Sequence, residues 1–283
     1  MHSVVAGLLP LRWALLALLV WALSGPFAGA NAADDGQERT TGLIFNEIRG
    51  QYATQDQLNA AVTKAYGVKL PPDKETVARE VMQALFQNRA FSAYLARIIL
   101  PINRRDLTRA EVSSAIAEGI LQLQVKGLAR LGPEKQAAFV KHIIGMAGWV
   151  PAPLCKSMYT GRLDTIAATA VERRYVVQLP IGGFESITGL YRQAVEAELA
   201  RFPDVRSINA QQASLAENVF QSASTKRLRA QLAQDAIFRV SNDAEAAPAA
   251  EVCAALSATL EGMLDMAEPY RSWQLIRFMQ SMQ

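Results

Sequence analysis

The sequence has few of the residues from which catalytic and metal sites are usually built. Its 283 residues include only two histidines and two cysteines, and His142 is the only histidine after position 2. A zinc site needs three or four Cys, His or carboxylate ligands, and no Asp-rich calcium loop is present either. Nucleophilic catalysis by a Ser-His-Asp or Cys-His set would depend on His142, which no Gly-x-Ser-x-Gly motif accompanies. We therefore expect no metal and no cofactor, and we interpret His142 as an ordinary helix-face or core histidine.

An excess of charge of one sign is also missing. The chain has 29 Lys and Arg against 26 Asp and Glu, a net charge of +3. This balance is too close to neutral to predict nucleic acid or an anionic membrane as the partner. The short basic clusters, such as Arg104-Arg105, are not interleaved with the aromatic side chains that single-strand binding surfaces use. We expect the partner to be a protein or a small ligand, and not nucleic acid.

Long apolar runs are absent after residue 33, but one lies near the start of the chain. Arg12 precedes the apolar run Trp13–Leu23, Ser24-Gly25-Pro26 ends it, and Ala30-Asn31-Ala32 supplies a small-x-small site. This layout predicts a cleavable signal peptide over residues 1–32. The alternative is an uncleaved anchor, although spanning a bilayer takes about 20 apolar residues. We expect a soluble periplasmic or secreted protein, with no stable membrane insertion after cleavage.

The two cysteines, Cys155 and Cys253, both lie in the part of the chain predicted to be exported. An oxidising compartment and an even cysteine count favour a disulfide between them. Closing a loop of about 100 residues stabilises a fold by up to about 4.7 kcal/mol in the chain-entropy model. A redox-active or nucleophilic pair is the alternative, but there is no Cys-x-x-Cys motif. Trp149–Leu154 is interpreted as a stiff extended connector that would position Cys155.

Apolar residues recur at helical spacing nearly everywhere after residue 33. Thr54–Gln57 has the pattern of a capping box, and Gly67 is a helix stop. Thr108–Glu111 is a second capping box, and Gly132-Pro133 suits an N-cap followed by the first helical position. These signals predict where several of the helices begin and end.

Two further patterns concern the lengths of the helices and how closely they pack. Residues 73–100 carry two consecutive apolar stripes, which we interpret as one long helical segment that Pro101 ends. Gly119 and Gly127 lie on one apolar stripe, although each would cost a helix about 1 kcal/mol relative to Ala. We interpret these glycines as sites where a neighbouring helix packs closely.

Only the middle of the chain departs from the helical spacing of apolar residues. Arg174–Leu179 is rich in β-branched residues and is predicted as a possible short strand. The expected fold class is all-α, a multi-helix bundle of about eight to ten helices with at most one short strand. We expect residues 33–283 to form a single helical domain with a possible subdivision near residue 150. No repeat of 20–50 residues indicates a solenoid.

One dipeptide suggests catalysis. Glu185-Ser186 resembles the catalytic Glu followed by Ser of lytic transglycosylases, helical exported enzymes that cleave cell-wall glycan. The resemblance implies Glu185 as a general acid, and half-shielding by Phe184 would raise the pKa of its carboxyl group and allow it to protonate a glycosidic oxygen. It covers the dipeptide alone, because Thr188–Arg192 stands where that family has a Gly-Leu-Met-Gln segment. The favoured interpretation is chance or helix capping, with Ser186 as an N-cap.

These observations favour an exported, non-catalytic helical protein of the bacterial envelope that binds a protein or a small ligand. The bacterial source is inferred from the style of the leader. One alternative is a cell-wall glycan-cleaving enzyme with Glu185 as its acid. A second is a carrier of an apolar ligand, for which a large apolar cavity would be the sign.

Overall fold

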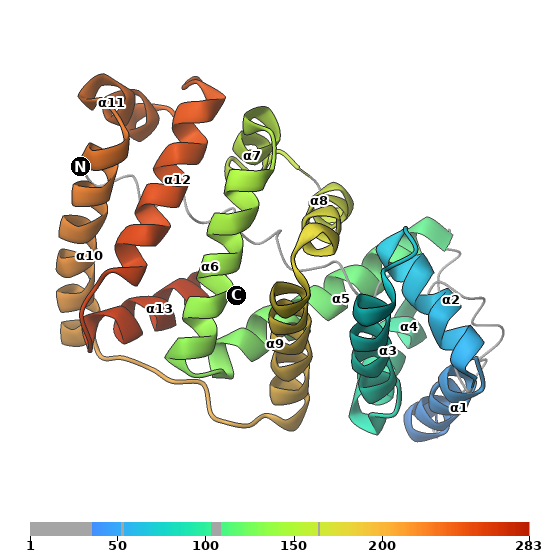
Figure 1. Cartoon of the computed structure of the whole chain (residues 1–283). Helices are drawn as coiled ribbons and strands as arrows, with labels where there is room; N and C mark the ends of the chain where they lie inside the picture. Colours follow the sequence, from blue (N-terminus) through green and yellow to red (C-terminus); the bar gives the residue numbers. More distant parts are fainter. Residues whose placement is uncertain (1–35, 52–53, 103–108, 164, 283) are drawn as a thin grey trace. The chain divides into compact units, whose positions relative to one another are not determined.

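The computed structural model describes residues 36–51, 54–102, 109–163 and 165–282, and the regular secondary structure of these residues is α-helical throughout (Figure 1). The all-α prediction is therefore confirmed, while the count of eight to ten was too low, because thirteen helices are present in the described ranges. They are α1 Gly36–Gln51, α2 Gln55–Tyr66, α3 Pro72–Phe86, α4 Arg89–Ile102, α5 Arg109–Arg130, α6 Pro133–Trp149, α7 Ala152–Tyr159, α8 Thr165–Gln178, α9 Ile181–Ala200, α10 Ala210–Gln231, α11 Gln234–Asn242, α12 Ala249–Leu264 and α13 Tyr270–Ser281.

The predicted signal peptide, residues 1–32, lies outside the described residues. Across the described ranges, no helix combines the length and the apolar character needed to cross a membrane.

The segment predicted as one long helix over 73–100 is two helices, α3 and α4. The chain breaks at Asn88, whose side-chain oxygen accepts hydrogen bonds from the N–H groups of Ala90 at 2.9 Å and Phe91 at 3.3 Å. An Asn in this position starts a new helix, and the sequence interpretation overlooked it. Pro101 does not end the segment either, because α4 continues to Ile102.

The strand predicted at Arg174–Leu179 is wrong, because residues 174–178 continue helix α8. Val176 is fully buried, so its β-branched side chain packs in the core from a helical backbone. Burial of one helix face outweighs the β-propensity of a short run, which is a weak and context-dependent preference.

The predicted extended connector Trp149–Leu154 is also mostly helical. Helix α6 ends at Trp149 and α7 begins at Ala152, which leaves only Val150 and Pro151 between them. Pro153 lies in the first turn of α7, where the N–H that proline lacks would have no intrahelical partner. The prolines therefore start a helix here and do not prevent one.

The predicted caps at Thr54 and Gly132 are confirmed. The N–H of Gln57 donates to Thr54 Oγ1 at 3.3 Å, and the N–H of Thr54 donates to Gln57 Oε1 at 3.0 Å. Gly67 ends α2 in the left-handed region at φ 70°. Gly132 is the N-cap of α6, which begins at Pro133. The capping box predicted at Thr108 falls on a residue outside the described ranges.

The contacts divide the chain into two compact units, which are described separately. Within the described residues, unit 1 comprises 128–163, 165–175 and 203–282, and unit 2 comprises 36–51, 54–102, 109–127 and 176–202. The boundaries fall within α5, within α8 and after α9, so the predicted subdivision point near residue 150 lies inside unit 1. A single cooperative domain over residues 33–283 remains a prediction.

Helix α12 is the centre of unit 1. It packs against α6, α7, α10, α11 and α13 (Figure 1). Its side chains at Val252, Leu260 and Met263 have no exposed surface. Helix α10 approaches α12 at Gly262, where a Cβ atom would lie 2.7 Å from Ser224 Cα. A residue without a side chain is needed at this crossing.

In unit 2, α3 packs against α9, and α1 packs against α4. The close packing predicted at Gly127 is confirmed, because a Cβ atom there would overlap the carbonyl group of Ala194 in α9. A Cβ atom at Gly119 would overlap the side chain of Ile98 in α4. The two glycines therefore mark places where other helices contact α5 closely.

Candidate functional site

His142 lies in α6 and is buried, so the interpretation as a core histidine is confirmed. Its Nε2 atom is 3.1 Å from Oε1 of Glu172 in α8. The two side chains are 5% and 0% exposed. A buried polar pair of this kind fixes the position of one helix against the other, because separating the two groups would leave a buried polar atom without this partner.

Tyr175 extends this pair toward the surface of unit 1. Its ring lies 5.3 Å from the His142 ring and 5.6 Å from the Trp149 ring, measured between centroids. Burial raises the pKa of the Tyr175 hydroxyl. The hydroxyl oxygen lies only 2.2 Å from the place where a Cβ atom of Gly145 would be, so this glycine makes room for the ring. We call His142, Tyr175 and Trp149 the aromatic strip.

Trp149 is the outer end of the aromatic strip, with 43% of its surface exposed. At Gly148 beside it, no heavy atom other than those of its chain neighbours and its own helix backbone lies within 4 Å of the place where a Cβ would be, so the backbone next to Trp149 is open. Aromatic faces bind apolar groups, C–H faces and cations by stacking. Glu172 has no exposed surface, so its carboxylate does not reach a molecule bound on Trp149. The arrangement suits binding more than acid–base chemistry.

Sequence reasoning identified only His142 of this group. Glu172 and Tyr175 are three residues apart on α8, and His142, Gly145 and Trp149 follow one face of α6 at helical spacing. The signal was therefore present. It was hidden because residues 174–179 were interpreted as a strand, in which Glu172 and Tyr175 would not share a helix face.

The predicted disulfide between Cys155 and Cys253 is present and joins α7 to α12 within unit 1. The two Cα atoms are 6.0 Å apart. Cys155 is 1% exposed and Cys253 is 9% exposed, so an attacking thiolate has little access to either sulfur. This burial favours the structural interpretation of the pair over the redox-active one.

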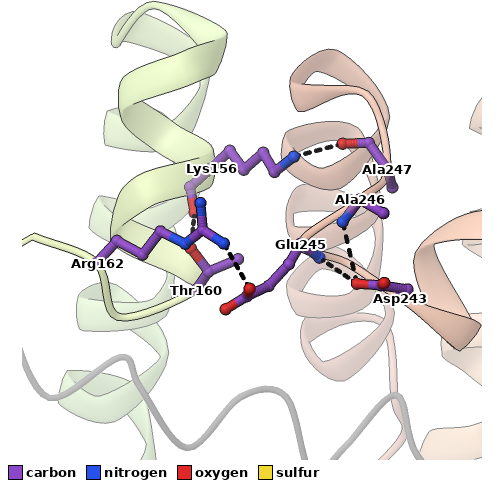
Figure 2. A network of polar contacts seen from close by, with 7 residues as sticks. All are labelled: Lys156, Thr160, Arg162, Asp243, Glu245, Ala246 and Ala247. Atoms are coloured by element: carbon purple, nitrogen blue, oxygen red, sulfur yellow. Dashed lines mark hydrogen bonds and ion pairs between the residues drawn. The ribbon is translucent and has the colours of Figure 1, made fainter.

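Polar contacts reinforce the same corner of unit 1 (Figure 2). Lys156 Nζ donates to the carbonyl oxygen of Ala247 at 2.6 Å, and Arg162 pairs with Glu245 at 2.5 Å. The carboxylate of Asp243 accepts hydrogen bonds from the two backbone N–H groups at positions 245 and 246. The turn between α11 and α12 is thereby held against α7, next to the disulfide.

The structure places Glu185 on the surface, in the second turn of α9. Phe184 does not shield it, because the Phe184 side chain is fully buried and its ring lies 5.5 Å from that of Tyr66. Ser186 is not an N-cap, since α9 begins at Ile181 after Pro180. The shielding and the capping expected at this dipeptide were therefore both wrong.

Among the described residues, no three His, Cys, Asp or Glu side chains gather closely enough to hold a metal ion. The chain matches no protein-family model, no curated protein sequence and no solved structure.

Proposed function

We propose that this chain is an exported, non-catalytic binding protein of the bacterial envelope, and that its protein or small-molecule ligand docks on the exposed end of the aromatic strip. The observation that carries the proposal is the exposed ring of Trp149, which contacts Tyr175 in a tilted arrangement, with Tyr175 in turn next to the ring of the buried His142 that pairs with Glu172.

Large aromatic side chains are mostly buried in folded proteins, so a Trp with 43% of its surface exposed is a candidate contact residue. Trp and Tyr are also the residues that most often dominate binding energy at interfaces. Here Tyr175 is fixed from below by His142 and by the space at Gly145. A surface that is already ordered loses less conformational entropy when a ligand binds.

The predicted signal peptide and the buried disulfide support an extracytoplasmic location, because disulfides persist in oxidising compartments. The near-neutral net charge favours a protein or an uncharged small ligand over nucleic acid.

Site-specific photo-crosslinking in a bacterial host tests the binding site, because the crosslinker captures whatever molecule occupies it. A benzophenone side chain at position 149 is expected to give one discrete adduct. At position 238, where Phe238 is 67% exposed on α11 of the same unit, it is expected to give none. Tyr175→Ala should weaken the adduct at position 149. The proposed site is rejected if positions 149 and 238 give the same products.

Export is tested separately by fractionating cells that produce the full chain. We expect the periplasmic or secreted fraction to contain a protein whose N-terminus is Ala33. An intact N-terminus retained in the membrane fraction would contradict export as a freed protein.

A further inference from the structure

The connection between α9 and α10 is an exposed, non-helical segment. Helix α9 ends at Ala200 and α10 begins at Ala210, and every residue from 201 to 207 is exposed. Phe202 and Val205 are 73% and 38% exposed, so the apolar side chains of the segment do not anchor it in a core. Exposed segments of this kind are preferred sites of proteolytic cutting.

Two polar contacts hold the backbone of this segment within unit 1. Arg130 Nη1 donates to the carbonyl oxygen of Pro203 at 3.1 Å, and Gln280 Nε2 donates to that of Arg206 at 3.3 Å. The neutral bond from Gln280 contributes about 1 kcal/mol, and the bond from the charged guanidinium of Arg130 contributes about 1.5–3 kcal/mol. Opening the segment therefore costs much less than opening a helix, where several consecutive backbone hydrogen bonds break together.

Arg206 is the basic residue of this segment whose two neighbours, Val205 and Ser207, are both exposed and both lie outside any helix. Other basic residues in described turns are held more firmly. The backbone N–H of Arg162 donates to the carbonyl oxygen of Ser157 at 2.9 Å, and its guanidinium pairs with the carboxylate of Glu245.

Lys69 and Arg201 are restrained through the residue that follows each of them. Lys69 is followed by Leu70, which is 3% exposed. Arg201 is followed by Phe202, whose N–H bonds back to Ala197 in α9 at 3.1 Å. Among the turns that the structure describes, the Arg206–Ser207 bond is the one that an arginine-specific enzyme can bind with the least distortion of the surrounding backbone.

We propose that the Arg206–Ser207 peptide bond is a processing site for an arginine-specific endopeptidase. The reaction is hydrolysis: the bond between the Arg206 carbonyl carbon and the Ser207 nitrogen breaks, water supplies the hydroxyl of the new carboxyl group, and the Ser207 nitrogen takes up the hydrogen. The proposal does not depend on what binds to the aromatic strip.

The product of this cut is a two-chain protein held together covalently. Position 206 lies between Cys155 and Cys253, so the disulfide joins the two fragments. The core of unit 1 also draws on both fragments, because α6 and α7 on one side of the cut pack against α12 on the other. Unit 2 lies wholly before position 206 in its described part. Cutting therefore changes the connectivity of the chain and leaves both cores assembled.

Limited digestion of the oxidised protein with trypsin tests this proposal. The first cut is expected to give one band on a non-reducing gel and two bands after reduction, and the smaller fragment should begin at Ser207. Arg206→Gln should slow this cut by more than about tenfold, because the specificity pocket no longer receives a cationic side chain. The substitution keeps the backbone oxygen that Gln280 binds.

Arg229→Gln is the matched control, because Arg229 is exposed on the helical backbone of α10 and its loss should leave the first cut unchanged. Circular dichroism of the cut, unreduced protein should match that of the intact protein. A first cut at another residue, fragments that separate without a reductant, or loss of helix content after cutting would each overturn the proposal.

Discussion

At the residue scale, the glycines of the helices have different roles that depend on what surrounds them. Gly127 in α5 faces the Ala194 carbonyl directly. At Gly189 in α9, no heavy atom other than those of its chain neighbours and its own helix backbone lies within 4 Å of the place where a Cβ would be. Both belong to unit 2 and both lie inside helices. The effect of an added methyl group on stability is therefore determined by the neighbouring helix at Gly127 and by helix propensity at Gly189.

The substitutions Gly127→Ala and Gly189→Ala are expected to have opposite effects on stability. At Gly127 the added methyl pushes α9 away and destabilises the fold by about 1–3 kcal/mol. At Gly189 the same change stabilises by about 0.5–1 kcal/mol, because Ala is the better helix former. Urea unfolding of both variants checks this. A loss of stability at Gly189 equal to that at Gly127 would show that contact with Ala194 is not the cause.

The buried pair of His142 and Glu172 is expected to show coupling between its members. His142→Leu or Glu172→Met alone should destabilise by about 2 kcal/mol or more, because each takes one hydrogen-bond partner from the buried polar group that remains. The double substitution should cost less than the sum of the two, since it removes both polar groups. A double-mutant cycle in denaturant measures the difference, and additive effects would contradict a direct interaction.

Glu185 is the residue that separates the binding and the glycan-cleaving interpretations. Because it is exposed and Phe184 packs elsewhere, we expect the protein to clear no peptidoglycan in a zymogram. Glu185→Gln should then leave ligand binding unchanged. Clearing that disappears in Glu185→Gln would replace the binding proposal with catalysis.

At the scale of helices, the helix starts and ends that depend on residues close in the sequence were predictable. The capping box at Thr54 and the Gly132-Pro133 start follow from residues within one turn, and the structure reproduces both. The helical state of residues 174–178 was not predictable in this way, because it follows from burial of Val176 against other elements. The aromatic strip was missed for the same reason, since it needs both α6 and α8.

Ion pairs across the contact between α10 and α12 are expected to make unit 1 less stable in acid. Arg227 hydrogen-bonds to Asp265, and this contact lowers the pKa of the carboxyl group. A carboxyl whose folded-state pKa is depressed stabilises the fold above its unfolded-state pKa of about 4, and this contribution is lost as pH falls toward the folded-state pKa.

The stability difference between the wild type and Asp265→Asn should therefore be present at pH 6 and shrink steadily as pH falls below about 4. Melting temperatures across that range measure it. Asp204→Asn, which changes an exposed carboxyl outside this contact, is the control. A difference that stays constant with pH would contradict the role assigned to Arg227.

At the scale of the whole molecule, the disulfide acts within unit 1 only. Cys155 and Cys253 both belong to that unit, which is assembled from two distant parts of the chain. A covalent link between such parts restricts the unfolded chain, and the restriction grows with the length of the closed loop. The disulfide therefore stabilises unit 1, which contains α12, against unfolding. It stabilises unit 2 only if the two units unfold together.

Replacing both cysteines with Ala is expected to destabilise unit 1 by up to about 4.7 kcal/mol, the value for a loop of about 100 residues. Hydrogen exchange reports this helix by helix: amide protection in α12 should fall by up to about three-thousandfold, while protection in α3 of unit 2 should stay within about threefold. An equal fall in α12 and α3 would show instead that residues 33–283 unfold as the single cooperative domain predicted from the sequence. No change in α12 would show that the contacts of Lys156 and Arg162 hold that corner without the disulfide.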